Sequence, residues 1–160
     1  MRTDYIDLGM IHFVDEAAEF QSIMNGEFME YVRGLKEQGI IRHIGMSTHN
    51  PAVAKMGALC GEIEMILFSI NPAFDMLPAS ENIEDYFKER YEEELGGIAP
   101  ERAELYRICE QEEVGITVMK GYAGGRLFSA EASPFGVALT PVQCLHYALT
   151  RPAVASVMGG

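Results

Sequence analysis

Residues 4–12, DYIDLGMIH, form the first full apolar run of the chain and decide its fold. The run is short, mostly apolar and bounded by polar residues, which predicts a buried strand that ends at His12. It begins almost at the N-terminus, and four later segments repeat its pattern. We therefore expect residues 4–12 to continue a larger sheet rather than to open a complete fold.

Strand and helix patterns alternate along the rest of the chain. The predicted strands cover residues 40–47, 64–70, 115–120 and 153–158, and the predicted helices cover 27–38, 51–59, 100–114 and 141–149. In the first helix the apolar spacing of three and four predicts one buried face, made of Phe28, Tyr31, Val32 and Leu35. Gly39 ends that helix in a left-handed conformation.

Two segments depart from this alternation. The acidic residues 14–26 have no clean period and predict a loop with a short helical piece. Residues 73–97 are strongly charged and predict a long insertion with an exposed helix, either a substrate-side loop or a solvated helix held by a few aromatic residues.

The fold class is predicted to be α/β, because strands joined by helices form right-handed crossovers and a parallel sheet. Such a sheet is either open and doubly wound or part of a (β/α)₈ barrel. A barrel uses about 31 residues for each unit, so 160 residues have room for about five. The chain also begins and ends on a strand, which would leave two open edges. We therefore expect one partial barrel domain over residues 1–160, corresponding to strands four to eight.

Composition narrows the possible partners and location. Twelve Lys and Arg residues against 24 Asp and Glu residues give a net charge of −12, which opposes nucleic-acid binding. No apolar run is long enough to span a membrane, and no signal peptide is visible. Three separated cysteines indicate a reducing compartment, so we expect a cytoplasmic protein. The four histidines show no metal-ligand spacing.

A polar set of residues follows the predicted strands. Parallel barrels and open sheets both bind ligands at the carboxyl ends of their strands. The residues there are His12, Ser47, Thr48, His49, Asn50, Asn71, Pro72, Lys120, Gly121, Gly124, Gly125, Gly159 and Gly160. Each of them also has an ordinary structural explanation, because serine and asparagine cap helices and glycines form turns. Their occurrence together at one edge favours a site for an anionic or amide-bearing ligand.

Several of these stretches resemble the aldo-keto reductase family. The resemblance rests on residues 4–12, on GIIRHIGMS at 39–47 and on Asn71-Pro72. The phrase STHNP at 47–51, with VMKG at 118–121 and GGRL at 124–127, is similar to the branch that often carries a ferredoxin-like iron–sulfur segment. The family consists of (β/α)₈ barrels that transfer hydride between NADP(H) or NAD(H) and a carbonyl or alcohol.

The resemblance implies roles for individual residues. His12 matches the histidine that donates a hydrogen bond to the substrate oxygen, and Ser47 with Thr48 matches the pair that binds the nicotinamide carboxamide. Asn71, Lys120 and the glycine loop fall on the cofactor side. Leu67 stands where a glutamine is common, and Lys120 where an aromatic residue stacks on the nicotinamide. No Cys-x-x-Cys cluster supports an iron–sulfur centre in this chain.

The family's acid, tyrosine and lysine lie on strands that would precede residue 1. We therefore predict that the chain is a fragment that does not catalyse alone. One alternative is a non-catalytic binding or assembly module that self-associates through its open edges. A second is another phosphate-binding barrel, in which the loop 121–125 holds a substrate phosphate.

Overall fold

The structure is a computed structural model that describes residues 3–76 and 97–159. Its elements follow in the order β1 (Ile6–Ile11), α1 (Ala17–Met24), α2 (Glu27–Glu37), β2 (Ile41–Thr48), α3 (Pro51–Leu59), β3 (Met65–Ser69), α4 (Pro72–Asp75), α5 (Pro100–Gln111), β4 (Gly115–Met119), the 3₁₀ helix η2 (Ala123–Phe128), α6 (Pro141–Leu149) and β5 (Val154–Val157). All five predicted strands are present. The helix inside the acidic loop is α1. The exposed helix predicted within 73–97 lies outside the described residues, and α4 is a separate, buried helix at the start of that segment.

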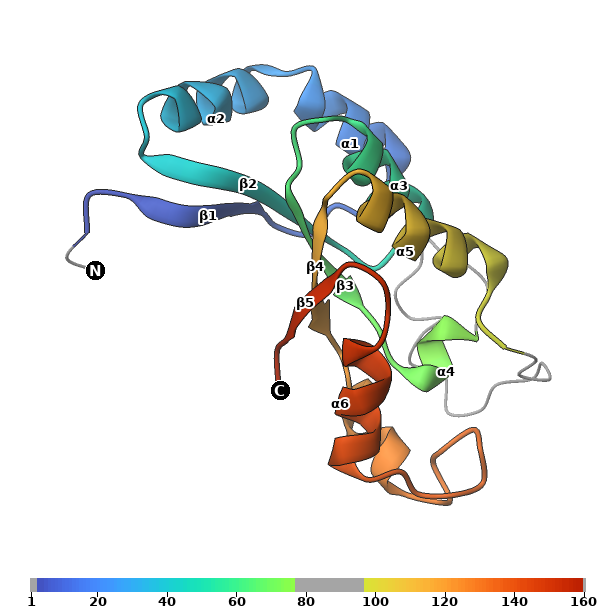
Figure 1. The fold of residues 1–160 in the computed structure, drawn as a ribbon. Helices are drawn as coiled ribbons and strands as arrows, with labels where there is room; N and C mark the ends of the chain where they lie inside the picture. The colour runs from blue at the N-terminus through green and yellow to red at the C-terminus, as the bar shows by residue number, and fades with distance from the viewer. Residues whose placement is uncertain (1–2, 77–96, 160) are drawn as a thin grey trace.

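The five strands form one parallel sheet in the order β1-β2-β3-β4-β5. Each strand is paired with the next in sequence, and α1, α2, α3 and α5 lie on one face (Figure 1). An open doubly wound sheet reverses its strand order at a switch point, whereas a barrel advances in one direction. The described sheet never reverses. The strand order therefore favours one wall of a (β/α)₈ barrel.

The main core lies between the sheet and the helices. Met46, Ile66 and Val118 point from the three central strands into this layer and are at most 1% exposed. They meet buried side chains of α3 and α5, including Val53 and Leu105. A smaller cluster packs α4, η2 and α6 together beyond the ends of β3 and β4, and it consists of Ala73, Phe74, Ala123, Leu127 and Cys144.

The ends of the helices follow the expected local rules. Asn50 caps α3 by accepting a hydrogen bond from the Ala52 amide at 2.9 Å, with Pro51 in the first helical turn. Thr140 and Gln143 form a reciprocal capping box at α6. Gly39 adopts a φ of 72° after α2, which confirms the predicted left-handed stop.

The predicted inner face of α2 is confirmed for Val32 and wrong for Phe28 and Tyr31. Phe28 and Tyr31 are 52% and 66% exposed, whereas Met29 and Val32 are buried. Each exposed aromatic residue precedes a buried residue by one position, or about 100° of helical rotation. The helix is therefore rotated so that Met29 and Val32 face the core, and the aromatic rings lie on the surface.

The outer strands are also less buried than predicted. Ile6 in β1 is 44% exposed, and Ala155 and Ser156 in β5 are exposed. Within the described residues each outer strand has a partner on one side only, because β1 and β5 end the sheet order. An apolar run alone cannot distinguish a central strand from an outer one.

Candidate functional site

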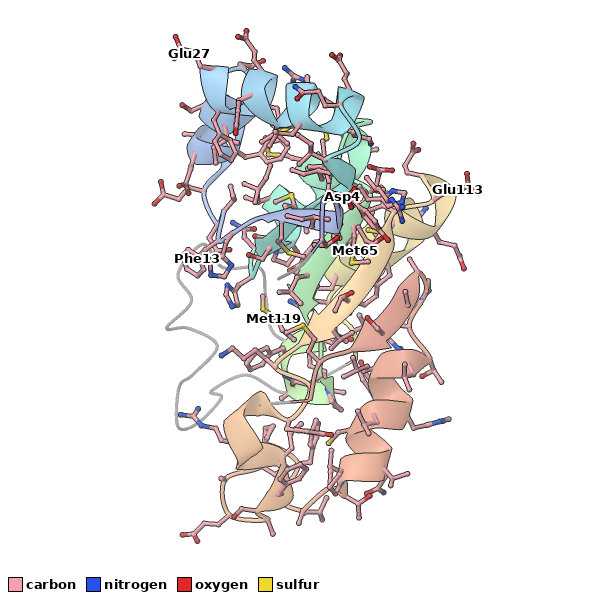
Figure 2. The ribbon with its side chains drawn as sticks, turned by 90° about the vertical axis from the view of Figure 1, so that its left-hand side faces the viewer. Asp4, Phe13, Glu27, Met65, Glu113 and Met119 are labelled. Atoms are coloured by element: carbon pink, nitrogen blue, oxygen red, sulfur yellow. The ribbon has the colours of Figure 1, made fainter. Side chains whose placement is uncertain are left out.

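The carboxyl ends of the strands gather the predicted site residues at one edge of the sheet. Figure 2 shows the two ends of the parallel strands. Asp4, Met65 and Glu113 lie at or near the amino ends of three strands, and Phe13 and Met119 lie at or just after the carboxyl ends of two strands, at the opposite edge. His12 precedes Phe13 and Lys120 follows Met119, so both belong to this second edge. The observed contacts divide the candidates into two groups.

The first group joins His12 to Ser47. Nδ1 of His12 lies 2.9 Å from Oγ of Ser47, and the backbone amide of Phe13 donates to the same oxygen at 2.7 Å. Ser47 is buried, whereas His12 is exposed. The contact agrees with the strand register, in which Ile11 is opposite Met46 and His12 is therefore next to Ser47.

The hydrogen bonds of Ser47 favour one tautomer of His12. A serine hydroxyl has one donor and two acceptor positions, and the Phe13 amide occupies one acceptor position. Among the described residues the Ser47 proton has no acceptor other than Nδ1 of His12. With that proton donated, Nδ1 is an acceptor, and the neutral ring carries its hydrogen on Nε2. His12 thus offers an N–H donor from an exposed ring.

A strained backbone follows the histidine. Phe13 has a φ of 61°, which is rare for a bulky residue. The next residue, Val14, donates its amide to the Ser47 carbonyl at 2.9 Å. Such strain costs on the order of 1–3 kcal/mol and persists only where surrounding contacts enforce it. The chain after His12 is therefore held against β2 by several hydrogen bonds.

Thr48 points away from the exposed edge. Its side chain is fully buried, and its hydroxyl donates to Oδ1 of Asp15 at 2.8 Å and accepts from the Asn50 amide at 3.1 Å. The hydroxyl is engaged in joining two loops. A role for Thr48 at the carboxamide stays a prediction.

Asp15 and His49 form a buried pair, of which only His49 belongs to the set of polar residues predicted at the strand ends. Oδ1 of Asp15 accepts the His49 backbone amide at 2.6 Å, and Oδ2 lies 3.1 Å from Nδ1 of the same residue. Burial raises the pKa of Asp15, but the hydrogen bonds from His49 and Thr48 outweigh it, and the pKa lies below its ordinary value. Asp15 is therefore an anionic acceptor at neutral pH.

The tautomer of His49 is opposite to that of His12. Its Nδ1 donates to the Asp15 carboxylate, and its buried Nε2 has no hydrogen-bond partner among the described residues. The ring of Phe13 packs edge-on against His49 with 5.5 Å between the ring centroids. The only sequence signal for this pair is an aspartate three residues after a histidine that ends a strand.

The second group joins Asn71 to Lys120. The amide nitrogen of Asn71 donates to the Lys120 carbonyl at 2.9 Å, and its oxygen accepts from the Phe74 amide at 2.9 Å, which caps α4. Lys120 has a φ of 58° and is exposed. Asn71 thus anchors the turn that presents Lys120, and its own amide group is fully buried.

The glycine loop continues from Lys120. Gly121 is buried, and a Cβ atom there would lie 3.5 Å from Cγ1 of Val157. Gly124 and Gly125 are exposed with φ angles of 65° and 85°, and a Cβ atom on either would meet no atom of the described residues within 4 Å. The loop therefore leaves open space beside backbone that a ligand can approach closely.

A buried ionic network stands behind this second group. Oδ1 of Asp75 accepts from Nε of Arg102 at 2.9 Å and from the hydroxyl of Tyr106, while Oδ2 accepts from the hydroxyl of Tyr147 at 2.8 Å. Arg102 also donates to the Ser69 carbonyl at the end of β3. Burial raises the pKa of Tyr106 and Tyr147, and the Asp75 charge raises both further. The network joins the end of β3 to α4, α5 and α6.

The described part of the chain contains no cluster of metal ligands, and its three cysteines are free thiols. No group of three or more His, Cys, Asp or Glu residues there could hold a metal ion. Cys60, Cys109 and Cys144 are free thiols, and burial raises the pKa of Cys109 to about 12. Within the same residues, no helix has the length and apolarity needed to cross a membrane.

Five parallel strands in sequence order, with polar groups at their carboxyl ends, define part of a (β/α)₈ barrel. Residues 1–138 match the sequence pattern of the Aldo/keto reductase family, and the chain belongs to this family. The resemblance and the fold class predicted from the sequence are thereby confirmed. The likeness to the iron–sulfur-carrying branch stays a prediction.

Solved structures agree in fold. The aldo-keto reductase AKR11C1 from Bacillus halodurans in its holo form is 23% identical, with a TM-score of 0.61 over 99% of this chain and 51% of its own. An aldo/keto reductase from Klebsiella pneumoniae, solved with NADP and acetate, is 18% identical, with a TM-score of 0.55 over 99% of this chain and 50% of its own. The chain thus spans about half the length of these structures. A comparison with curated protein sequences gives no match.

Proposed function

We propose that this chain supplies the substrate-oxygen side of an NAD(P)H-dependent oxidoreductase that acts on a small carbonyl or alcohol. The observation that carries the proposal is the 2.9 Å contact between Nδ1 of His12 and Ser47, which leaves Nε2–H as an exposed donor. Hydride arriving at a carbonyl carbon leaves negative charge on the oxygen. A donor held in place at that oxygen stabilises the charge as it develops.

The cofactor implied by the family is NADP(H) or NAD(H), which supplies the hydride. Ser47 fits a carboxamide in one respect, because its oxygen keeps one acceptor position after the bonds to His12 and Phe13. The open space at Gly124 and Gly125 fits a closely approaching ligand, and Lys120 adds positive charge beside it. Asn71 supports this region by anchoring the Lys120 turn.

We also propose that the 160 residues do not catalyse alone. The family's acid, tyrosine and lysine find no match in the sequence, so His12 would act without a proton donor. Incubation of the chain with NADPH, NADH and a panel of small aldehydes is expected to show no cofactor oxidation at 340 nm above a H12A control. Turnover that H12A abolishes would contradict inactivity of the chain while supporting the role of His12. We place this activity in the cytoplasm, in keeping with three free cysteines.

A second candidate is a self-associating module, favoured by the uncovered face of the sheet. A Cβ atom on Gly45 would lie 3.2 Å from Cδ1 of Leu8 and 3.5 Å from Cε of Met10, so both side chains lie on the face opposite Met46. No described helix covers this face (Figure 1). Light scattering tests the idea: a stable dimer that L8E dissociates would favour assembly, and a monomer over a wide concentration range would contradict it.

A further inference from the structure

Asp15 lies in the same loop after β1 as His12 and faces the turn that follows Ser47 and Thr48 of β2, yet it bonds to neither His12 nor Ser47. Its carboxylate accepts from the Thr48 hydroxyl and the His49 amide, and its carbonyl accepts from the Asn50 side chain at 3.0 Å. Asp15 is only 6% exposed. These bonds tie the loop after β1 to the turn between β2 and α3.

The hydrogen bonds that hold this loop against β2 begin directly after His12. The amides of Phe13 and Val14 bond to Oγ and the carbonyl of Ser47, and the bonds of Asp15 to the β2–α3 turn follow directly. The positive φ of Phe13 requires such enforcement, since a free chain would relax to a common conformation. Relaxation there would move His12 away from Ser47.

We propose that Asp15 is a positioning residue, whose carboxylate fixes the β2–α3 turn so that Ser47 stays bonded to Nδ1 of His12 and the His12 hydrogen stays on Nε2. The role of the Nε2 hydrogen at a substrate oxygen rests on the proposed function. The effect of Asp15 on the His12 tautomer does not, because it requires neither cofactor nor substrate.

A carboxylate suits this position better than an amide. The donors that converge on its two oxygens are the Thr48 hydroxyl, the His49 amide and Nδ1–H of His49. An asparagine would turn an N–H donor toward one of them. His49 would then have to move its proton to Nε2, which is buried and lacks a hydrogen-bond partner among the described residues.

The test is the tautomer of His12 in the ¹⁵N-labelled 160-residue chain, read from long-range ¹H–¹⁵N correlations at about pH 8, where imidazole is largely neutral. The wild-type chain is expected to show His12 as the Nε2–H form. In D15N the Nδ1–H population is expected to rise about fivefold, the size set by loss of one ordinary hydrogen bond. D7N is the matched control, because Asp7 lies in β1, just before the loop that carries Asp15, and is the exposed partner of Arg42.

A folded D15N chain with an unchanged His12 tautomer would overturn the proposal. Should D15N fail to fold, T48V removes one bond to the same carboxylate without changing its charge, and a smaller shift in the same direction is expected. A wild-type tautomer in T48V would equally overturn it. These readouts need no cofactor, so loss of NADPH binding or activity would count against the proposed function alone.

Discussion

Oγ of Ser47 lies 2.9 Å from Nδ1 of His12, although 35 residues separate them in the chain. The parallel register of β1 and β2 brings them together, because it aligns Ile11 with Met46. The same oxygen accepts the Phe13 amide, so a single hydroxyl orients the histidine and supports the strained residue after it. Four consequences of the structure can be measured.

Replacing Ser47 with alanine removes the acceptor of the Phe13 amide and the partner of His12. The half-buried amide is left unsatisfied, so we expect a loss of about 1–2 kcal/mol in the free energy of unfolding, measured by urea denaturation. Ser22 in α1 is exposed, and S22A is expected to change stability by less than about 0.5 kcal/mol. Equal effects of the two changes would contradict the role of Ser47.

Two glycines in helices are expected to respond to alanine in opposite directions. A Cβ atom on Gly57 in α3 would lie 2.4 Å from Sδ of the buried Met46, so G57A is expected to lose about 1–3 kcal/mol through overpacking. A Cβ atom on Gly34 in α2 would have only Nε2 of Gln38 nearby, at 3.9 Å. G34A is expected to gain about 0.5–1 kcal/mol. Thermal unfolding compares them, and stabilisation by G57A would contradict the packing of α3 on β2.

The buried pair Asp75–Arg102 is expected to matter far more than the exposed pair Asp7–Arg42. Both side chains of the first pair are 0% exposed, whereas Asp7 and Arg42 are 74% and 50% exposed. D75A leaves a buried guanidinium without its carboxylate and is expected to cost about 3–5 kcal/mol. D7A is expected to cost less than about 1 kcal/mol. Similar urea midpoints for D75A and D7A would contradict a stabilising role for the buried hydrogen-bond network around Asp75.

Glu64 is expected to make stability depend on pH in the acid range. Burial raises its pKa, but hydrogen bonds from Lys36, His43 and the Ile44 amide outweigh that effect and lower the pKa from 4.5 to about 2. The folded chain therefore binds fewer protons than the unfolded chain in this range. The contribution of Glu64 is complete above the unfolded pKa and is lost as the pH falls toward the folded one.

Urea midpoints at about pH 7 and about pH 3 measure this effect. The wild-type chain is expected to lose more stability over that interval than E64Q, which lacks the titrating group. E19Q, which alters an exposed glutamate of α1, is expected to behave like the wild-type chain. If E64Q showed the same pH dependence as the wild-type chain, the acid-range loss of stability could not be assigned to Glu64.

The alternation of strands and helices could be predicted from the sequence because each element carries its own local signal. The capping residues Asn50 and Thr140 marked two helix starts, and Gly39 marked a helix end. The burial of β1 could not be predicted, because an apolar run does not show how many neighbours a strand has. The burial of Val32 could be predicted, but the burial of Met29 in place of Phe28 and Tyr31 could not, because the large aromatic side chains carry the stronger apolar signal.

His12 and Ser47 could be predicted as neighbours from their places at two strand ends. Asp15 could not, because it stands beside Glu16 in an acidic loop, where a carboxylate usually faces solvent. Only the register of β1 with β2 carries residue 15 to the turn at 48–50. A buried acceptor such as Asp15 therefore cannot be recognised from the sequence before the pairing of the strands is known.

His12 is proposed to be the hydrogen-bond donor at the substrate oxygen of an aldo-keto reductase site. The most direct test joins this chain to the first half of the Bacillus halodurans relative and measures NADPH-dependent reduction of a small aldehyde by the folded chimaera. We expect H12A to lower kcat at least about tenfold while NADPH binding is kept, because a charge-stabilising donor is lost. A folded, NADPH-binding chimaera that turns over equally well with H12A would contradict it.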